Sequence, residues 1–453
     1  MHERLEVTTR GGGAPLLVRG GDVVTLEGEP IRSGSVLVAG ERIAAVGKSV
    51  AAPRGARVLD ASGAIVVPGF VQTHVHLCQT LFRGLADDLP LLDWLRRRIF
   101  PLEAAHDERS LRASARLSCA ELLKSGTTAV LTMESVHDTD VVFEALLESG
   151  LYATAGRCLL DRGEGLPRRL RDTARRAMAE SLALADRWHG AAGGRLRYAL
   201  APRFVPGCSE GLLRDVAREA ASRSLIVHTH ASENRDEVAL VRKLTGRDNV
   251  RYLDDVGISG KRVVIAHGVH LAANEIALLA RRGTRVAHCP SSNLKLGSGI
   301  APVARLRRAG VSVSLGADGA PCNNRLDPFI EMRLAVGLAS VTGKPGDLTA
   351  LAALRMATRD GAEALGLGAD MGSLAPGKLA NLAVVDRRSL PATPVDDPVS
   401  AVVYSATAAD VRHVLVAGRV AVRDGALTGY DEEAVKADAL RERRRVLSRA
   451  RLR

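Results

Sequence analysis

The middle of the chain, from about residue 68 to residue 366, alternates short apolar runs rich in β-branched residues with longer stretches of helical character. This alternation is typical of parallel βα units. The stretches 110–124 and 173–188 are long enough to be crossover helices. Eight runs are predicted to be strands: 69–76, 127–133, 151–159, 196–204, 225–231, 263–269, 285–290 and 312–318. Eight parallel strands indicate an α/β fold with a closed (β/α)8 barrel of the TIM type.

The two ends of the chain have a different sequence pattern, in which short apolar runs are separated by glycine. Such runs lie at 16–18, 23–26, 36–39 and 42–46, and again within 372–386 and 411–425. This spacing is typical of short strands. We therefore expect a small β-sandwich domain formed by residues 1–66 and 371–428, a catalytic barrel over 67–370, and a charged helical tail over 429–453.

Polar residues stand where the predicted barrel strands end. The first strand ends in His74 and His76, the fifth in His230, the sixth in His267 and the eighth in Asp318. Catalytic groups of such barrels lie at the C-terminal ends of the strands. Each of these side chains would otherwise be a buried polar group without a partner, so their coincidence indicates a shared function.

A metal site is the function that these residue types indicate. His74 and His76 are two residues apart on one strand, so both imidazoles point to the same face. With His230 and Asp318 they offer three nitrogen ligands and one carboxylate, a set suited to a divalent metal with a position left for water. We expect Zn2+, with Fe2+ or Mn2+ as alternatives. Such an ion makes hydroxide available near neutral pH.

The remaining histidines receive a structural interpretation or no role. We interpret three of them as held by packing or pointing into the barrel wall: His228, His270 and His288. Four others lie in helical or loop contexts and are given no function: His106, His137, His189 and His413.

The composition adds constraints on the partners and the compartment. Lys and Arg number 63 against 51 Asp and Glu, a formal charge of +12. The arginines are spread through helical stretches without interleaved aromatic residues, so we interpret the excess as solvated surface and expect no nucleic-acid partner. The six cysteines have no CxxC spacing, and no stretch reaches the roughly 20 apolar residues of a membrane span. We expect a cytoplasmic protein with no membrane partner and reduced thiols.

Five ordered motifs carry a resemblance to a known family: PGFVQTHVHL, HTHASE, AHGVHL, HCPSSNLKLGSGIAPV and LGADGAPCNN. They resemble the amidohydrolase superfamily. Within it they are similar to the branch that holds S-adenosylhomocysteine, methylthioadenosine and 5'-deoxyadenosine deaminases, guanine deaminase and the s-triazine hydrolases. The resemblance continues through GSLAPGKLANLAVVD and VRHVLVAGRVAVRDG.

The resemblance implies a role for each strand-end residue. The residues that match the family's metal ligands are His74, His76, His230 and Asp318. Glu233 matches the acid that protonates a ring nitrogen, and His267 matches the histidine that orients or polarises the attacking water. With Asp318 as the base, Glu233 completes the pair of proton-transfer groups that hydrolytic deamination needs. No barrel-strand lysine stands where binuclear relatives carry a bridging carbamate, so we expect a single metal per chain.

Different residues of the chain match family members that act on different substrates. Glu103 matches the residue that nucleoside deaminases use on ribose hydroxyls, although a solvent-exposed carboxylate at a helix end is the alternative interpretation. Arg203 and Gln79 instead match the carbonyl-recognising pair of guanine deaminase. Our leading hypothesis is a metal-dependent deaminase of an amino-substituted purine nucleoside of the 5'-deoxyadenosine, methylthioadenosine or S-adenosylhomocysteine type, releasing ammonia. The alternatives are a guanine, 8-oxoguanine or pterin deaminase and an s-triazine amino- or chlorohydrolase.

Further residues are candidates for the substrate pocket. Trp94 either forms a wall of the pocket or only packs in the protein interior. Cys322 is expected to be a small pocket-lining side chain and not a nucleophile. Arg157 and Arg169 are candidates to meet a distal acidic group of the substrate, but surface placement is favoured for both. By resemblance, the protein is expected to be a homodimer or a higher homo-oligomer.

Overall fold

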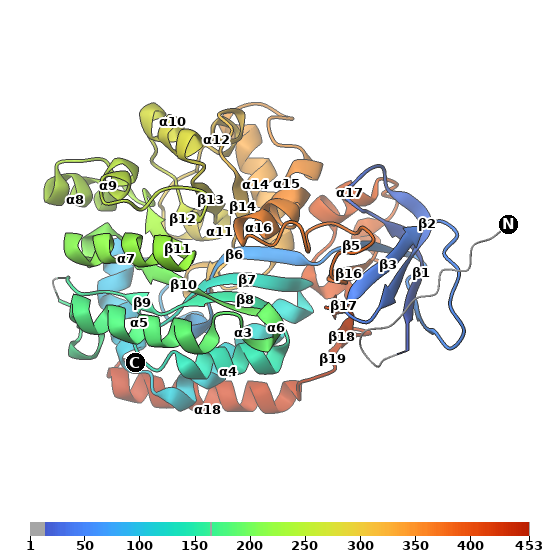
Figure 1. Ribbon diagram of the computed structural model, residues 1–453, viewed down its shortest axis with the longest axis horizontal. Coiled ribbons are helices and arrows are strands. Elements are labelled where there is room, and N and C mark those ends of the chain that lie inside the picture. The colour runs from blue at the N-terminus through green and yellow to red at the C-terminus, as the bar shows by residue number, and fades with distance from the viewer. Residues whose placement is uncertain (1–13, 164, 453) are drawn as a thin grey trace.

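The computed structural model describes residues 14–163 and 165–452. Residues 1–13 of the predicted sandwich and residue 453 of the predicted tail therefore lie outside the described part. A barrel of strands surrounded by helices makes up most of the molecule, and a separate sheet lies beside it (Figure 1).

All eight predicted barrel strands are present. They pair in parallel in chain order, so the predicted fold class is confirmed. The strands are β6 (Phe70–His76), β7 (Thr127–Met133), β8 (Tyr152–Gly156), β9 (Cys158–Leu159), β10 (Leu196–Pro202), β11 (Ile226–Ala231), β12 (Val263–His267), β13 (Arg285–His288), β14 (Val313–Leu315) and β15 (Asp318–Gly319). Strands three and eight of the prediction are each formed in two parts, β8 with β9 and β14 with β15.

The barrel closes through the two parts of the eighth strand. The first part, β14, pairs with β13, whereas β15 pairs with β6. Gly316 lies between the two parts, and a Cβ atom there would lie only 2.6 Å from the carbonyl oxygen of His74. Only glycine therefore allows the eighth strand to approach β6 so closely. This approach brings Asp318 level with Val75, between the two histidines of β6.

Helices follow the strands around the barrel. The longer ones are α3 (Glu108–Lys124), α4 (Asp140–Ser149), α5 (Ala174–Trp188), α7 (Glu210–Arg223), α8 (Arg235–Thr245), α10 (Ala273–Arg282) and α14 (Pro328–Thr342). Short elements lie between them: η1 (Leu77–Phe82), α1 (Leu91–Trp94), η2 (Leu95–Ile99), α2 (Phe100–Ala104), η3 (Arg168–Leu170), α6 (Ala191–Gly194), η4 (Val205–Gly207), α9 (Asn249–Asp255), α11 (Pro290–Lys295), α12 (Val303–Arg308), α13 (Ala320–Asn323), α15 (Ala350–Met356) and α16 (Arg359–Ala364). The predicted helices 110–124 and 173–188 correspond to α3 and α5, and the Thr173 side chain caps α5.

The separate sheet is built from both ends of the chain. Its strands are β1 (Leu16–Val23), β2 (Ile31–Ala39), β3 (Arg42–Gly47), β4 (Arg57–Asp60), β5 (Ala64–Pro68), β16 (Leu382–Asp386), β17 (Val411–Val416), β18 (Arg419–Arg423) and β19 (Ala426–Leu427). The two ends join where β5 pairs with β16. Val66 and Val384 belong to the sheet's own core, whereas Val67 and Val385 pack into the barrel core. Because β5 continues almost directly into β6, this sheet anchors the strand that carries His74 and His76.

The C-terminal part of the chain is a docked helix, preceded by the short elements η5 (Leu390–Ala392), α17 (Pro398–Ser400), η6 (Ala401–Ser405) and η7 (Ala408–Asp410). This helix, α18 (Glu432–Ala450), packs along α3 and α2, with Val446 buried against them. The Nε of Arg449 donates to the carbonyl oxygen of Ala105 at 2.6 Å. The helix therefore buttresses the segment that contains Glu103.

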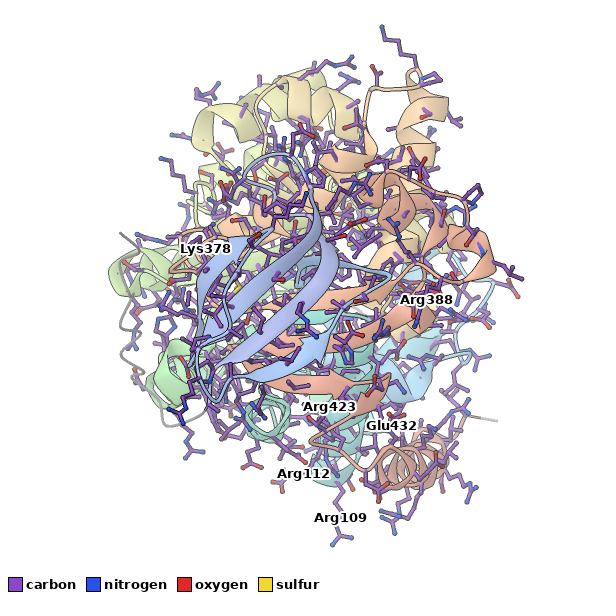
Figure 2. All side chains as sticks on the ribbon, turned by 90° about the vertical axis from the view of Figure 1, so that its right-hand side faces the viewer. Arg109, Arg112, Lys378, Arg388, Arg423 and Glu432 are labelled. Carbon is purple, nitrogen blue, oxygen red and sulfur yellow. The ribbon has the colours of Figure 1, made fainter. Side chains whose placement is uncertain are left out.

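The surface carries its positive charge at many separate places. Figure 2 looks onto the small sheet, where Lys378, Arg388 and Arg423 lie well apart from one another. Many of the cations are paired, as Arg388 is with Asp386 at 2.6 Å. All six thiols are free and buried. Among the described residues, no helix combines the length and the apolar character that a membrane span requires.

Candidate active site

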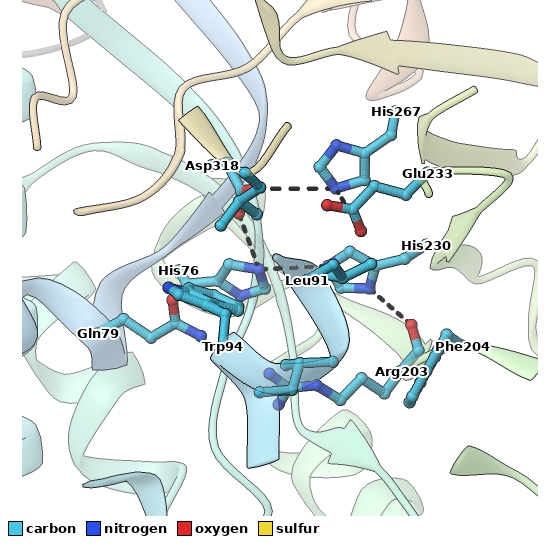
Figure 3. A pocket seen from close by; sticks show the side chains of 12 residues that line it. His76, Gln79, Leu91, Trp94, Arg203, Phe204, His230, Glu233, His267 and Asp318 are labelled. Carbon is cyan, nitrogen blue, oxygen red and sulfur yellow. Dashed lines mark hydrogen bonds and ion pairs between the residues drawn. The ribbon is translucent and has the colours of Figure 1, made fainter. Parts of the chain in front are cut away.

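A small cavity of about 30 Å3 lies at the C-terminal ends of the barrel strands (Figure 3). Its wall contains most of the residues that the sequence singles out. The lining residues are His76, Gln79, Leu91, Trp94, Leu95, Arg203, Phe204, His230, Glu233, His267, Leu296 and Asp318. They come from the ends of five barrel strands and from the α1–η2 segment, with Gln79 from η1 and Leu296 from the end of α11.

Main-chain carbonyl groups orient two of the histidines. The Nδ1 of His76 donates to the carbonyl oxygen of Met133 at 2.7 Å. The Nδ1 of His230 donates to the carbonyl oxygen of Arg203 at 2.6 Å. Because a neutral imidazole carries one proton, the Nε2 atom of each ring is left with a free lone pair. These two Nε2 atoms face each other at 3.4 Å without a proton to share.

His74 is oriented by a second histidine. The Nδ1 of His228 donates to the carbonyl oxygen of Val264 at 3.0 Å, so the Nε2 of His228 is an acceptor. The Nδ1 of His74, at 2.7 Å from that Nε2, must then be the donor. Burial keeps His228 neutral because it holds the pKa of this imidazole well below the usual value. The Nε2 of His74 is consequently a buried lone pair without a hydrogen-bond partner.

Asp318 completes this group of acceptors. Its Oδ1 lies 3.3 Å from the Nε2 of His74 and 3.2 Å from that of His76. The backbone of Asp318 has a φ of +62°, in the left-handed region that residues other than glycine adopt uncommonly. Ser292 Oγ donates to its Oδ2 at 2.6 Å.

The donor set fits a divalent cation. Lone pairs and a carboxylate that face one another at hydrogen-bond distances repel unless a positive charge lies between them. The ligand atoms of His74, His76 and His230 lie within 4.8 Å of one another, as do those of His74, His267 and Asp318. Nitrogen and oxygen donors in this arrangement suit zinc and other first-row metals.

Two proton-transfer candidates lie beside this cluster. The Oε2 of Glu233 is 3.5 Å from the Nε2 of His267, which is itself 3.9 Å from Asp318 Oδ2. Burial and the nearby Asp318 charge raise the pKa of Glu233 well above its usual value, so this carboxyl group can hold a proton. His267 is fixed by Asn293, whose side-chain oxygen accepts from Nδ1 at 2.9 Å.

Glu103, Arg203 and Gln79 form a single network on the opposite wall. Arg203 donates to both carboxylate oxygens of Glu103, from Nη1 to Oε2 at 2.8 Å and from Nη2 to Oε1 at 3.3 Å. Gln79 Nε2 donates to Glu103 Oε1 at 2.8 Å. Glu103 is 1% exposed, so its interpretation as a solvent-exposed carboxylate is wrong. The carboxylate is drawn inward because two donors neutralise and hydrogen-bond it.

The structure separates the other pocket candidates. Trp94 is buried and lines the cavity, so it both forms a wall and packs. Cys322 is buried but is not among the lining residues, and its thiol donates to the carbonyl oxygen of Gly319 at 3.0 Å. Cys322 therefore does not line the cavity in this conformation, although it packs in one cluster with Trp94 and Leu296, and the pocket-lining position expected for it stays a prediction.

The two arginines considered for a distal acidic group are both engaged elsewhere. Arg157 is fully buried, so the favoured surface placement is wrong for it. Its guanidinium pairs with Asp172 and, at 2.9 Å, with Glu180, which offset its burial. Arg169 is exposed and donates to Asp138 at 2.9 Å. Neither arginine lines the cavity.

Sequence reasoning assigns no function to three residues that support the site. His228 and Asn293 orient His74 and His267, as described above. Glu134 accepts from the backbone N–H groups of Leu77 at 3.1 Å and Cys78 at 2.9 Å, and burial raises its pKa to about 7. The position of Glu134, directly after β7, is the signal that could have identified it.

Comparisons with known proteins agree with this geometry. A model of the amidohydrolase family matches residues 65–421. The chain is 43% identical to a 5'-deoxyadenosine deaminase of Methanothermobacter thermautotrophicus, covering 93% of this chain and 96% of the relative. It is 39% identical to a 5-methylthioadenosine/S-adenosylhomocysteine deaminase of Pelotomaculum thermopropionicum, covering 96% and 100%. A crystal structure of an adenosine deaminase from Xanthomonas campestris with bound zinc superimposes with a TM-score of 0.90 at 33% identity, covering 96% and 99%.

Proposed function

The chain belongs to the amidohydrolase family, and we propose that it hydrolyses the exocyclic amino group of an adenine nucleoside and releases ammonia. One observation carries the chemical part of the proposal: the ring nitrogens of the histidines converge with Asp318 beside Glu233, a carboxyl group whose burial raises its pKa well above the usual value. A cation site and a proton donor at one cavity are what hydrolytic deamination of a heterocycle requires.

Four residues would hold one divalent ion, with zinc as the proposed metal: His74, His76, His230 and Asp318. When bound, the ion acts as a Lewis acid and makes a water molecule nucleophilic near neutral pH. Zinc is favoured because imidazole nitrogens outnumber carboxylates in the set. His228 serves as the outer partner that fixes the tautomer of His74.

The protein's own groups would move the protons. Asp318 accepts a proton from the attacking water, and the oxygen of this water forms a bond to the carbon that bears the amino group. Glu233 gives its proton to the adjacent ring nitrogen, and His267, fixed by Asn293, orients the water. Asp318 passes the proton from the water to the amino group, the C–N bond breaks and ammonia leaves, while the new hydroxyl group gives its proton to Glu233 and becomes the oxo group. The products are ammonia and the oxo form of the purine ring, so the water atoms are fully accounted for.

The proposed substrate class is an adenine nucleoside altered at its 5' position. The relatives named above act, by their names, on 5'-deoxyadenosine and on methylthioadenosine and S-adenosylhomocysteine, and they align with nearly the whole chain. The cavity of about 30 Å3 is too small for a nucleoside, so Leu91, Trp94 and Leu95 would have to move outward when the substrate binds. We also propose a homodimer or higher oligomer and a cytoplasmic location.

A second candidate is supported by the wall opposite the metal site. Arg203 and Gln79 both line the cavity, and an arginine donor is well suited to a carbonyl oxygen. A guanine, 8-oxoguanine or pterin base, or a triazine, would use this wall without a ribose contact. The choice between the two candidates is a choice of substrate within one chemistry.

Ammonia release from protein loaded separately with Zn2+, Fe2+ or Mn2+ tests both candidates. The panel comprises adenosine, 5'-deoxyadenosine, methylthioadenosine, S-adenosylhomocysteine, guanine, 8-oxoguanine, pterin and melamine. We expect the highest kcat/KM with a nucleoside that is altered at its 5' position. Turnover of the bases or of melamine alone would contradict the nucleoside proposal.

Elemental analysis tests the metal proposal independently of the substrate. We expect about one divalent ion per chain, as one set of three histidines and one aspartate holds. Full activity after exhaustive chelation, or two tightly held ions per chain, would contradict it.

A further inference from the structure

We propose that Glu237 is a positioning residue for Glu233, because its side chain holds the main chain of Glu233 from the first turn of α8. This inference rests on the proposed deaminase function, in which Glu233 delivers a proton to the ring. Glu237 does not line the cavity, so its effect on the reaction would pass through Glu233.

The first argument is the contact between Glu237 and the main chain of the acid. The Oε2 of Glu237 accepts from the backbone N–H of Glu233 at 3.2 Å. Its other oxygen, Oε1, accepts from the side-chain amide of Asn249 on α9. Both of these side chains are buried. The backbone of Glu233 is thus linked through two buried side chains to a second helix.

Glu237 differs from a glutamate that only caps a helix. A capping glutamate at the third position of a helix binds the backbone N–H of the N-cap residue, which is Asn234 in α8. The contact in this protein extends one residue further back, to Glu233, and the second oxygen is used by Asn249. The carboxyl group therefore fixes the residue before the helix as well as the distance between α8 and α9.

The peptide group between Ser232 and Glu233 is held at both of its polar atoms. Ser232 has a φ of +56°, in the left-handed region that residues other than glycine adopt uncommonly. Its carbonyl oxygen accepts from the N–H groups of Val269 and His270, each at 2.8 Å, in the loop after β12. The N–H of the same peptide group donates to Glu237. These contacts fix the orientation of the peptide group, and with it the direction in which the Glu233 side chain leaves the backbone.

The Glu233 side chain depends on this backbone because it has little other support. Its carboxyl group lies 3.5 Å from His267 Nε2 and receives no hydrogen bond from the described residues (Figure 3). A displacement of about 1 Å in a catalytic group can lower a rate by about 100-fold. Loss of the Glu237 contact should therefore lower kcat even though Glu237 lies outside the cavity.

The experiment is a double-mutant cycle between Glu237 and the acid. Glu237→Met removes the acceptor atoms but fills most of the space, and it is made in the wild-type and in the Glu233→Gln protein. In the wild-type background we expect kcat to fall by about 10-fold to 100-fold, with KM and metal content within about twofold of normal. In the Glu233→Gln background we expect a change in kcat of less than about twofold, since no acid is left to position.

The cycle separates a positioning role from a general structural role. A residue needed only for stability or for metal binding acts independently of the acid. Glu237→Met would then lower kcat by the same factor in both backgrounds, and this outcome overturns the proposal. A wild-type kcat in the single variant overturns it as well. All values are measured with the best substrate of the panel.

Glu275→Met is the matched control. Glu275 is also buried, and it accepts from the backbone N–H groups of Val250 and Ala272, each at 3.0 Å, which lie outside the loop that carries Glu233. Its kcat should stay within about twofold of the wild-type value, since its hydrogen bonds do not reach the acid. A loss as large as that of Glu237→Met would show that the effect is not specific to Glu237, and the proposal would fail.

Glu237→Gln is the conservative variant that should restore the contact. Burial raises the pKa of Glu237 to about 8, so its neutral form is present at neutral pH and a neutral amide can take its place. Asn249 Oδ1 has no hydrogen-bond partner among the described residues, and it can accept from the new amide once the Asn249 side chain rotates. We expect kcat within about threefold of the wild-type value. A loss equal to that of Glu237→Met would mean that the acceptor atom does not position Glu233, which overturns the proposal.

A crystal structure of Glu237→Met tests the positioning role without any substrate. We expect the peptide group between Ser232 and Glu233 to change its orientation. If it stays in place, Glu237 does not position it and the proposal fails. If the wild-type enzyme deaminates no compound of the panel, the proposed function fails instead, and the crystal structure still decides the role of Glu237.

A second substitution serves if Glu237→Met does not fold. Asn249→Ala removes the other contact of the Glu237 carboxyl group and replaces Glu237→Met in the cycle. We expect a smaller fall in kcat, of about threefold to tenfold, that is again absent in the Glu233→Gln background. An equal fall in both backgrounds, or none in the wild-type background, overturns the proposal.

Discussion

The two walls of the cavity are built in different ways. On the metal side, the functional side chains lie at the ends of hydrogen-bonded strands: His76 on β6, His230 on β11, His267 on β12 and Asp318 on β15. On the opposite side, Trp94 and Glu103 come from the short α1 and α2 segments, and Gln79 comes from η1. Strand pairing fixes the first wall, whereas in the second wall Arg203 directly follows β10 and the other three residues are held by side-chain contacts.

This difference predicts different responses to substitution. On the metal side, loss of a ligand should abolish the chemistry, since the ligand atoms of His74, His76 and His230 lie within 4.8 Å of one another, as do those of His74, His267 and Asp318. On the opposite side, substitutions should change which substrate is used and how tightly it binds. Substitutions on the two sides of the cavity therefore test that contrast.

The largest effect is expected for Asp318→Ala. The substitution removes a ligand and the proposed base together, and it leaves the Nε2 atoms of His74 and His76 without their anionic neighbour. Lewis-acid activation contributes several kcal/mol, so we expect kcat to fall by about 1,000-fold or more. Elemental analysis should show reduced metal content. A variant that retains both metal and activity would mean that Asp318 is not part of the centre.

Glu233→Gln should have a smaller effect and leave the metal in place. Its carboxyl group lies 3.5 Å from His267 but is not among the clustered ligand atoms. A positioned acid contributes about 100-fold to 10,000-fold, so kcat should fall by at least about 100-fold. Metal content and melting temperature are measured alongside kcat. A near-normal kcat would show that another group delivers the proton.

His228→Ala tests whether a residue that orients a metal ligand also contributes to metal binding. His228 contacts His74 at 2.7 Å and fixes its tautomer, although it does not line the cavity. Loss of such an outer partner costs about 10-fold to 100-fold in metal affinity or activity. Titration of the apoprotein with Zn2+ should show weaker binding than in a His270→Ala control, since the His270 ring donates to the carbonyl oxygen of Ser298 at 2.7 Å and does not line the cavity. Equal affinities would assign His228 to packing alone.

The sequence predicts the metal side well because strand periodicity and fold topology determine it. His74 and His76 share a face by the two-residue repeat of a strand, and the parallel order brings His230, His267 and Asp318 to the same rim. The pattern does not predict the breaks at Arg157 and Gly316. These depend on contacts between distant residues, such as the approach of Gly316 to His74.

The opposite wall is less predictable for the same physical reason. The sequence shows Glu103 as an alternative to the pair Arg203 and Gln79, whereas the structure shows that Glu103 neutralises Arg203 and accepts a hydrogen bond from Gln79. Arg157 is a similar case, because its burial depends on Asp172 and Glu180 and not on its own position in a strand. Long-range pairing of charged groups leaves no periodic signal in one sequence.

The smallest effect is expected for Trp94→Phe, a substitution on the side of the cavity opposite the metal. The indole ring lines the cavity, and its buried Nε1–H has no hydrogen-bond partner among the described residues. Phenylalanine retains most of the aromatic surface and removes that unpaired donor, so the melting temperature should not fall by more than a few degrees.

If the Trp94 donor is satisfied by the substrate, KM should rise by about threefold to tenfold, as the loss of one neutral hydrogen bond predicts, while kcat should change little. Measurement of KM and kcat with the best nucleoside, together with metal content, separates the two walls. A large fall in kcat with unchanged KM would mean that Trp94 stabilises the transition state. The side of the cavity opposite the metal would then contribute to the chemical step as well as to substrate binding. An unchanged KM together with an unchanged kcat would make Trp94 a packing residue, because the ring alone would then account for its place in the wall.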